Sequence, residues 1–328
     1  MEIITWYGTV IADEDGNLLP SECRLCPKEP EKLARHLVDS KPAKTNNPQL
    51  IDLRSAALEC GFVNSEKEYE SLLREVAIKT AKLKISNATT IDIRIIQAVE
   101  SIDDIDETTN LLSERLSEWY GLHFPELNLT SQELARFVAT YGSRSNIPPE
   151  NEWYEKASDS MGADLTGSEE KVIKDFAANL CRLYDNRKKI EDYIMENMEH
   201  AAPNLTNIAG ALLGSRLISM TGSLERLANL PSSTIQVIGA NRALFKHLRS
   251  RATSPKHGII FNHPLIKNAP WWQRGKIARA FASKISLAAR IDYYSGEINN
   301  KVSKNLEEKI QNIKESNPEP PKKNKSRR

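Results

Sequence analysis

The chain has 328 residues, 40% hydrophobic and 27% charged, which is ordinary for a globular protein of two or three domains. Its net charge of +1 conceals an asymmetry, because the first 205 residues carry 23 Lys and Arg against 37 Asp and Glu, whereas the remainder carries 22 against 7. No apolar run approaches the roughly 18 residues of a membrane span, and the N-terminus lacks the basic start and apolar block of a signal peptide. We therefore expect a cytoplasmic protein without membrane contact, whose basic half has an acidic partner.

The four cysteines give little support for a metal or redox centre. Cys23 and Cys26 form one C-x-x-C pair, while Cys60 and Cys181 stand alone in the sequence. A zinc site usually needs a second Cys or His pair at short spacing, and none is present nearby. We expect no metal and no cofactor, and two semi-buried thiols on a turn in a reducing compartment.

Residues 1–88 are typical of a small α/β domain. The β-branched and aromatic residues 3–10, followed by turn-forming residues 13–17, predict a hairpin. Helical patterns follow at Glu31–Val38, Pro48–Cys60 and Glu66–Leu83. No cluster of catalytic residue types is evident, so a docking domain is favoured over a fragment of an enzyme.

Residues 89–204 contain two long helical patterns with apolar residues at heptad spacing, and a shorter one at Ser131–Tyr141 between them. No glycine or proline interrupts either long pattern, which predicts an antiparallel helical hairpin. Arg187 occupies one position of the otherwise apolar seam. The candidate apolar seam residues are Ile102, Ile105, Leu112, Leu116, Phe176, Leu180, Leu183, Ile190 and Ile194.

This hairpin has two interpretations. It is either a self-contained bundle or a coiled coil that dimerises, with polar seam residues such as Arg187 fixing the register. The dimer is favoured, because two helices of this length do not cover their own apolar stripes. The seam residues are therefore predicted to be dimerisation residues.

From Thr206 to Ile291 the chain has 13 Lys and Arg and a single carboxylate, that of Glu225. Such a surface attracts a polyanion, and nucleic acid is the commonest one. Leu205–Leu217 predicts a helix with Gly210 and Gly214 on one face, which favours close helix packing. Neither glycine belongs to a dinucleotide or P-loop motif, so no nucleotide site is predicted.

A basic helix follows the apolar segment that ends at Gly239. Arg242, Lys246 and Arg249 lie at i, i+4 and i+7, one stripe of one face, and phosphate binding is favoured over a solvated face because acid is lacking. Lys256 and the neighbouring His257 stand on a glycine-flanked turn that can meet a base or a phosphate, although His257 has the alternative of a surface histidine without a role.

The segment 271–292 predicts an Ala-rich helix with a small-residue inner face and basic residues elsewhere. His263 is expected to be structural, and neither it nor His257 has a partner for nucleophilic catalysis. From residue 299 we expect a fraying helix and a disordered basic arm. The candidate RNA-binding residues are Arg216, Arg226, Arg242, Lys246, Arg249, Lys256, His257, Arg274, Lys276 and Arg279.

Three long segments carry a family resemblance. GALLGSRLISMTGSLERLANLPSSTIQVIGANRALFKHL, SPKHGIIFNHP and QRGKIARAFASKISLAARID resemble the Nop domain of box C/D ribonucleoprotein core proteins, and EWYGLHFPEL at 118–127 resembles a motif of that family's coiled-coil region. The resemblance covers essentially the whole chain. The short N-terminal domain and Lys-rich end are more similar to the archaeal Nop five branch than to its eukaryotic nucleolar relatives.

The resemblance implies a mainly α protein with four parts: an α/β domain (1–88) that docks the methyltransferase fibrillarin, a coiled-coil dimerisation domain (89–204), an all-helical Nop domain (205–298) and a basic, partly disordered tail (299–328). Family members are non-catalytic scaffolds for RNA 2′-O-methylation in rRNA processing. Their Nop domain grips box C/D guide RNA jointly with a kink-turn-binding protein related to a ribosomal protein. Two alternatives are a splicing-type Nop scaffold without a methyltransferase and an RNA-modifying enzyme.

One position departs from the family pattern. Where the family usually has G-A-E-K-A-L-F, this chain has Asn241 followed by Arg242. The basic residue is kept and the acid is lost, so any contact that this carboxylate makes in relatives is not expected here.

Overall fold

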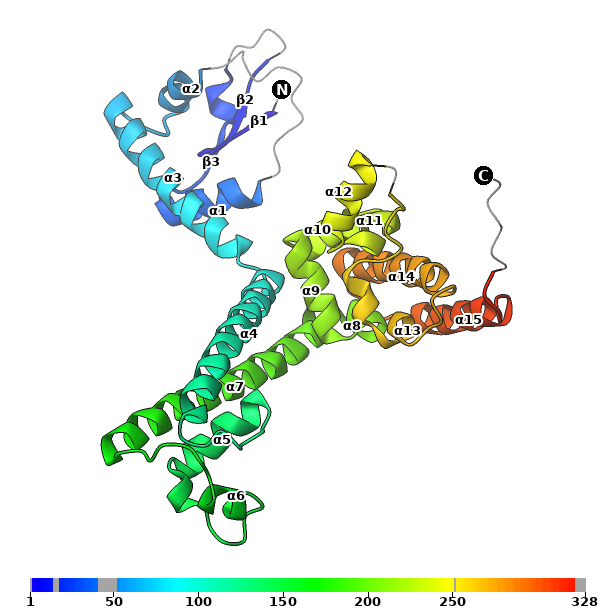
Figure 1. Ribbon diagram of the computed structural model, residues 1–328. Helices are drawn as coiled ribbons and strands as arrows, with labels where there is room; N and C mark the ends of the chain where they lie inside the picture. Colours follow the sequence, from blue (N-terminus) through cyan, green and yellow to red (C-terminus); the bar gives the residue numbers. More distant parts are fainter. Residues whose placement is uncertain (1, 14–17, 41–51, 251, 322–328) are drawn as a thin grey trace. The chain divides into compact units, whose positions relative to one another are not determined.

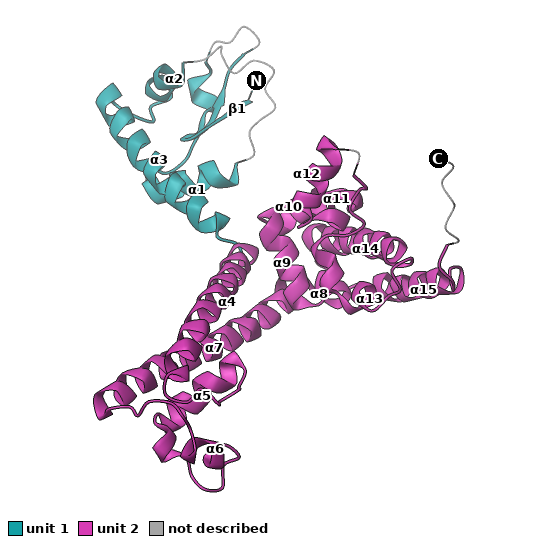
Figure 2. Cartoon of the chain, in the orientation of Figure 1, with its two compact units in different colours: residues 1–90 teal, residues 91–328 magenta. Residues whose placement is uncertain are grey.

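The computed structural model describes residues 2–13, 18–40, 52–250 and 252–321, which fall into two compact units, 1–90 and 91–328 (Figure 1, Figure 2). The architecture is mainly α-helical with one small sheet, which confirms the predicted fold class. The expected coiled-coil and C-terminal domains share the second unit, so the boundaries at 204 and 298 stay predictions. None of the described helices is both long and apolar enough to cross a membrane.

The first unit begins with an antiparallel sheet of order β1-β2-β3. Its strands are β1 (Glu2–Thr5), β2 (Gly8–Ile11) and β3 (Arg24–Leu25). The single strand expected over residues 3–10 is wrong, because a turn at Trp6 and Tyr7 divides it into β1 and β2. Gly8 permits this turn, since its φ is +140° and a Cβ there would lie 2.3 Å from the carbonyl oxygen of Arg24. Ala12 and Leu18, which flank the predicted turn at 13–17, form an antiparallel bridge. Residues 14–17 lie outside the described part of the chain.

Helices pack around a core of aromatic rings in this unit. They are η1 (Pro20–Glu22, a 3-10 helix), α1 (Pro30–Asp39), α2 (Leu53–Glu59) and α3 (Glu66–Ala88). The rings of Trp6, Tyr7, Phe62 and Tyr69 contact one another in the core between the sheet and these helices. Helix α2 begins after Asp52, whose carboxylate accepts a hydrogen bond from a backbone N–H, and residues 48–51 of the expected longer helix lie outside the described residues.

The cysteines differ from the expectation of two thiols at Cys23 and Cys26. Cys23 and Cys60, 37 residues apart in sequence, are joined as a disulfide with their Cα atoms 6.4 Å apart. Spacing along the chain does not reveal this pair, because the fold brings Cys60 at the end of α2 to the sheet. Cys26 is a thiol whose pKa is raised by burial. No group of three metal-binding side chains occurs among the residues that the structure describes.

The second unit contains the predicted helical hairpin. Its members are α4 (Ile91–Gly121), α5 (Ser131–Tyr141), η3 (Arg144–Asn146), α6 (Tyr154–Ser158) and α7 (Gly167–Ala201). Helices α4 and α7 pack along each other, and α5 packs on both (Figure 1). Capping boxes start α5 at Thr130 and α7 at Thr166, where each threonine pairs with a glutamate three residues later.

A polar layer separates two hydrophobic cores along this hairpin. One core surrounds Leu116 and Leu180, and the other continues from Ile102 and Ile194 into the C-terminal helices. Between them Arg187 forms ion pairs with Asp106 and, at 2.6 Å, with Glu191. The seam arginine is therefore satisfied by carboxylates of its own chain.

The C-terminal helices surround α14, which runs through the centre of the core shared with α4 and α7. They are α8 (Pro203–Ala209), α9 (Ala211–Thr221), α10 (Leu224–Asn229), α11 (Ser232–Val237), α12 (Asn241–Arg249), η4 (Ile259–Asn262), α13 (Pro264–Lys267), α14 (Arg274–Tyr294) and α15 (Lys301–Glu315). The inner face of α14 is made of Ala, Ile and Phe side chains, as its sequence predicts.

Two expectations for this region are wrong. The helix expected over Leu205–Leu217 is broken at Gly210, whose φ of 78° and ψ of 156° end α8 and start α9. Gly214 does serve close packing, because a Cβ there would lie 3.0 Å from Met198. Helix α15 is not a fraying end, since three apolar residues one turn apart pack it into the core. Residues 322–328 of the tail lie outside the described residues.

Candidate nucleic-acid interface

Helix α12, which is yellow in Figure 1, carries the predicted basic stripe. The helix has no buried residue. Arg242, Lys246 and Arg249 are all exposed. In the described part of 206–291, the single ion pair is the one that Arg216 forms with Asp103. The three charges of α12 are therefore uncompensated and accessible, as phosphate-binding side chains must be.

An apolar strip lies beside this basic stripe. Phe245 is 60% exposed and Leu248 is 70% exposed. They are three positions apart on the helix, so they share a face that adjoins Arg249. Leu244 and His247 are half-buried, and Nδ1 of His247 lies 2.6 Å from the carbonyl oxygen of Ala252. The strip was not predicted from the sequence, although two large apolar residues on a strongly basic helix were a signal for it.

The turn that carries Lys256 is fixed by backbone contacts with α11. Gln236 donates a side-chain hydrogen bond to the carbonyl of Lys256 at 2.6 Å and accepts one from the N–H of Gly258 at 2.8 Å. Gly258 has no alternative here, because a Cβ would lie 1.9 Å from the carbonyl oxygen of Ile238. The close approach of the two backbones therefore determines where Lys256 and His257 stand.

His257 forms part of a cation–aromatic stack. Its ring lies 4.6 Å from that of Phe261 at an interplanar angle of 16°, and the guanidinium of Arg274 lies 5.4 Å from the same phenyl centroid. Burial lowers the pKa of His257, and the positive charges of Arg274 and Lys256 lower it further. His257 is therefore neutral near pH 7 and offers a ring and a hydrogen bond, but no charge.

The basic residues of α14 differ in their hydrogen bonding and exposure. Arg274 donates to the carbonyls of Ala269 at 2.8 Å and Lys267 at 3.2 Å, so its guanidinium is held in place. Lys276 is exposed and donates to the side chain of Asn317. Arg279, one turn further on, is exposed. The start of α14 and the adjacent turn thus collect Lys256, His257, Arg274 and Lys276 in one place.

Arg216 and Arg226 do not belong to this cluster. Arg216 pairs with Asp103 of α4 and thereby joins α9 to the hairpin. Arg226 is exposed on α10, close to Gly222, where a Cβ would lie 3.2 Å from its guanidinium. Pairing makes Arg216 the weakest of the predicted RNA-binding residues, because a bound phosphate must replace an existing carboxylate.

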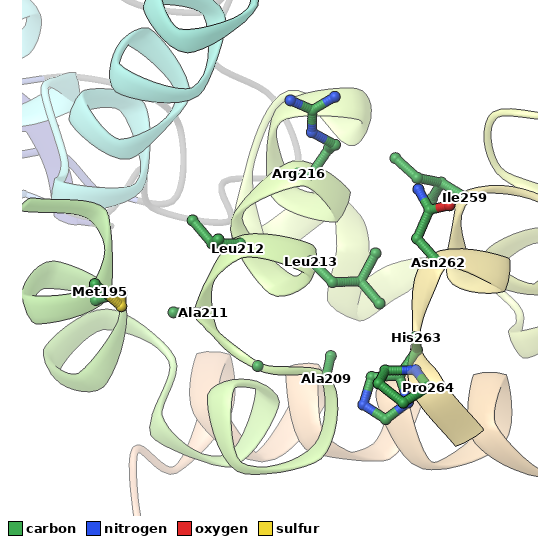
Figure 3. A pocket seen from close by; sticks show the side chains of 11 residues that line it. Met195, Ala209, Ala211, Leu212, Leu213, Arg216, Ile259, Asn262, His263 and Pro264 are labelled. Atoms are coloured by element: carbon green, nitrogen blue, oxygen red, sulfur yellow. The ribbon is translucent and has the colours of Figure 1, made fainter. Parts of the chain in front are cut away.

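An apolar pocket of about 470 Å³ opens where α8 meets α9, and Figure 3 shows Leu212, Leu213 and His263 on its wall. His263 accepts a hydrogen bond from the N–H of Leu265 at 3.3 Å and packs on Phe281, and burial lowers its pKa. This confirms the expected structural role of His263. The described lining includes no carboxylate or thiol that would pair with it for catalysis.

The predicted dimerisation residues are divided between the interior and the surface. Ile102, Leu116, Leu180 and Ile194 are buried in the cores of the chain itself. The remaining five, half-buried, are Ile105, Leu112, Phe176, Leu183 and Ile190. A second copy can contact only such partly exposed residues without opening the hairpin, together with exposed apolar residues such as Leu111, which is 65% exposed.

Comparisons with known proteins agree with a nucleic-acid role. A family profile described as "Nop: snoRNA binding domain, fibrillarin" matches residues 101–312. An uncharacterised NOP5 family protein of Methanocaldococcus jannaschii is 42% identical over 277 residues, covering 80% of this chain and 67% of the relative. Nucleolar protein 58 of Eremothecium gossypii is 37% identical over 246 residues, covering 71% of this chain and 48% of the relative.

A solved structure titled as that of a fibrillarin/NOP5P complex aligns with 95% of this chain and 100% of its own chain, with 25% identity and a TM-score of 0.46. The chain spans about half the length of the Nucleolar protein 58 relatives that it matches. The matched range 101–312 includes most of the hairpin and helices α8 to α14 with their basic cluster. On the extent of this match, the chain belongs to the Nop family.

Proposed function

We propose that this protein is a non-catalytic scaffold of a box C/D guide ribonucleoprotein, which links fibrillarin to a guide RNA bound by a kink-turn protein. The observation that carries the proposal is the exposed, uncompensated stripe of Arg242, Lys246 and Arg249 within a region that the family profile covers. The scaffold acts by position, since an enzyme held close to its target nucleotide reacts at a high effective concentration.

The RNA contribution rests on charge. Lys256, Lys276 and Arg279 are exposed near the start of α14, and α12 adds three further cations. Each phosphate that a cation neutralises releases counterions, so affinity is expected to fall steeply with salt. Arg216 is assigned a smaller share, because it is already paired with Asp103.

The protein partner at this end is assigned to the apolar strip of α12. Phe245 and Leu248 are too exposed to stabilise the chain itself, and they adjoin the basic stripe. A partner that is bound to the RNA and contacts α12 would cover the apolar strip, while its RNA would contact the basic stripe. This arrangement fits the kink-turn protein, whose bound RNA supplies the anion and whose surface supplies apolar contacts.

The methyltransferase is assigned to the first unit. One face of the sheet packs on the aromatic core, while Ile4, Thr9 and Arg24, which are cross-strand neighbours, share the other face. Ile4 is 42% exposed. A sheet face with an exposed apolar residue on one edge strand, β1, and an exposed charge on the other, β3, is suited to docking a folded partner, and the family description names fibrillarin.

A homodimer completes the proposed particle. The half-buried seam residues and Leu111 offer an apolar surface on the hairpin, and a second copy presents the same surface in return. Light scattering on the full chain tests this directly. A mass of one chain at every concentration up to the highest soluble one would contradict it.

Reconstitution tests the whole proposal. Fibrillarin, the kink-turn protein, a box C/D guide RNA and a complementary target RNA are combined with S-adenosylmethionine, with and without the full chain. We expect 2′-O-methylation at the guided nucleotide only when the chain is present, and none from the chain alone. Failure of fibrillarin to bind the chain would instead favour a splicing-type scaffold, and methylation by the chain alone would make it an enzyme.

A further inference from the structure

Two adjacent tryptophans before α14 have different surroundings. Trp272 is half-buried and donates from Nε1 to the carbonyl of Asn317 at 3.0 Å, which ties α14 to the end of α15. Trp271 is 58% exposed, and no described residue accepts a hydrogen bond from its indole. Trp272 thus has a structural role, whereas packing within the chain does not explain Trp271.

Trp271 is nevertheless held in place. Its ring meets that of Trp272 edge-on, with centroids 5.9 Å apart and an interplanar angle of 87°. The ammonium of Lys256 lies 5.8 Å from its centroid, an arrangement typical of a cation–π contact. The stem of Lys256 passes beside Gly275, where a Cβ would lie in ordinary contact with Lys256 Cδ at 3.5 Å. An exposed aromatic ring is therefore positioned beside an exposed cation.

A second stack adjoins the first through the chain. In this second stack His257 and Arg274 flank the ring of Phe261. His257 directly follows Lys256 in the sequence, and Arg274 lies three residues after Trp271. The two stacks together offer ring faces and positive charge within a region whose one carboxylate before residue 292 is Glu225. A protein partner with an acidic surface would explain the exposed charges. It would not explain why an exposed aromatic ring lies beside them.

We propose that Trp271 is a stacking platform for an unpaired base of the RNA, with Lys256 binding the adjoining phosphate. Bases stack on aromatic side chains when they are outside a duplex, and cations beside the ring take the backbone. The inference rests on the proposed RNA-binding function and adds to it a preference for single-stranded nucleotides at this position. Paired bases cannot use the platform, since their faces are covered by neighbouring pairs.

The test uses the full chain and two probes, a single-stranded RNA that carries one 2-aminopurine and the same RNA annealed to its complement. Trp271→Ala is expected to weaken binding of the single strand about 5- to 150-fold, the range found for losing one base–aromatic contact. Trp271→Phe keeps a ring and should restore most of the affinity. Duplex binding should not change. Tyr294→Ala, which removes a 67% exposed aromatic at the far end of α14, is the matched control.

Salt dependence separates the two residues. Trp271→Ala should leave the slope of log K against log salt unchanged, whereas Lys256→Gln should lower it by about 0.7, the value for one phosphate on a single strand. The inference is overturned if Trp271→Ala binds the single strand like the wild type, or if its affinities for single strand and duplex fall equally. It is also overturned if the variant loses only its affinity for the kink-turn protein in the absence of RNA. If the wild type binds neither RNA, the stacking inference fails, whereas the proposed function is tested separately with guide RNA already loaded with the kink-turn protein.

Discussion

The carboxylate of Asp292, near the end of α14, accepts the backbone N–H of Asn204 at 3.0 Å, at the start of α8. The same carboxylate accepts the side-chain amide of Asn204 at 2.6 Å and the N–H of Leu205 at 2.8 Å. Asn204 in turn donates to the carbonyl of Glu297 at 2.8 Å and accepts from the N–H of Asn299 at 2.7 Å. One buried polar network therefore joins α8, α14 and the segment that leads to α15, and it satisfies N–H groups that a helix start leaves unpaired.

Asp292→Asn is expected to destabilise the protein by about 2 kcal/mol, the usual loss when buried donors to a charged acceptor are left unsatisfied. The new amide cannot accept hydrogen bonds on both of its arms, so at least one N–H of the α8 start loses its partner. Chemical denaturation of the full chain measures the effect. Glu297→Gln, an exposed acid in the same segment, is the control, and equal stability of the two variants would refute this role of Asp292.

Stability should fall as the pH drops from 7 to 5, with His123 as one cause. His123 is buried, its Nδ1 lies 2.6 Å from the carbonyl of Ala163, and its Nε2 accepts the N–H of Arg144 at 2.9 Å. Both nitrogens are satisfied in the neutral ring, and burial, followed by the charge of Arg144, lowers the pKa of His123.

The sign of this pH effect follows from linkage. Below about pH 6.5, the ordinary histidine value, the unfolded chain takes up a proton that the folded chain does not. The stability contributed by neutral His123 is therefore present above that pH and is lost as the pH falls through the lowered folded pKa. His257 and His263, whose pKa values are also lowered, act in the same direction. His123→Gln should flatten the stability profile between pH 7 and 5, and an unchanged profile would contradict this.

Two glycines of the interface predict opposite outcomes for the same substitution. Gly258→Ala places a Cβ 1.9 Å from the carbonyl oxygen of Ile238, so the backbone must move, and we expect a loss of about 2 kcal/mol or more. Gly275→Ala meets Lys256 Cδ at 3.5 Å, an ordinary contact, and lies in the first turn of α14. It should be neutral or slightly stabilising. Thermal unfolding of both variants checks the contrast, which fails if they unfold at the same temperature.

Arg216 and Arg242 are expected to respond differently to neutralisation. Arg216→Gln removes an ion pair with Asp103 that is partly exposed, so it should cost up to about 1 kcal/mol of stability with little loss of RNA affinity. Arg242→Gln should leave stability unchanged and weaken RNA binding. Measuring both quantities for both variants decides between a structural and a binding role, and reversed outcomes would show that the assignment is wrong.

Long-range periodicity and charge were readable from the sequence because they repeat. The heptad spacing predicted the hairpin of α4 and α7, and the basic stretch with its single carboxylate predicted exposed cations on α12. Single-residue geometry was not readable. The break at Gly210 and the hairpin turn before Gly8 depend on backbone angles that only packing determines. The Cys23–Cys60 pair depends on a contact between residues far apart in sequence.

Residue type alone predicted which region is basic. The structure then showed which of its cations are paired and which of its apolar residues are exposed. Charge alone could not distinguish Arg216, which is paired, from Arg242, which is free. The exposure of Phe245, Leu248 and Trp271 was not predicted, because apolar residues in a helical pattern are normally assigned to the core. Their exposure is a property of how α12 and the start of α14 meet the rest of the fold.

The proposed binding of α12 to the RNA of a preassembled particle is tested most directly by salt-dependent binding. The full chain is titrated into guide RNA already loaded with the kink-turn protein, at several salt concentrations. One variant replaces Arg242, Lys246 and Arg249 by Gln, and its matched control replaces the exposed Lys301, Lys304 and Lys309 of α15. The α12 variant should lower the slope of log K against log salt by about 2 to 3, as expected for three lost phosphate contacts, and the control should not. No ternary complex at any salt, or equal slopes for the two variants, would contradict the account.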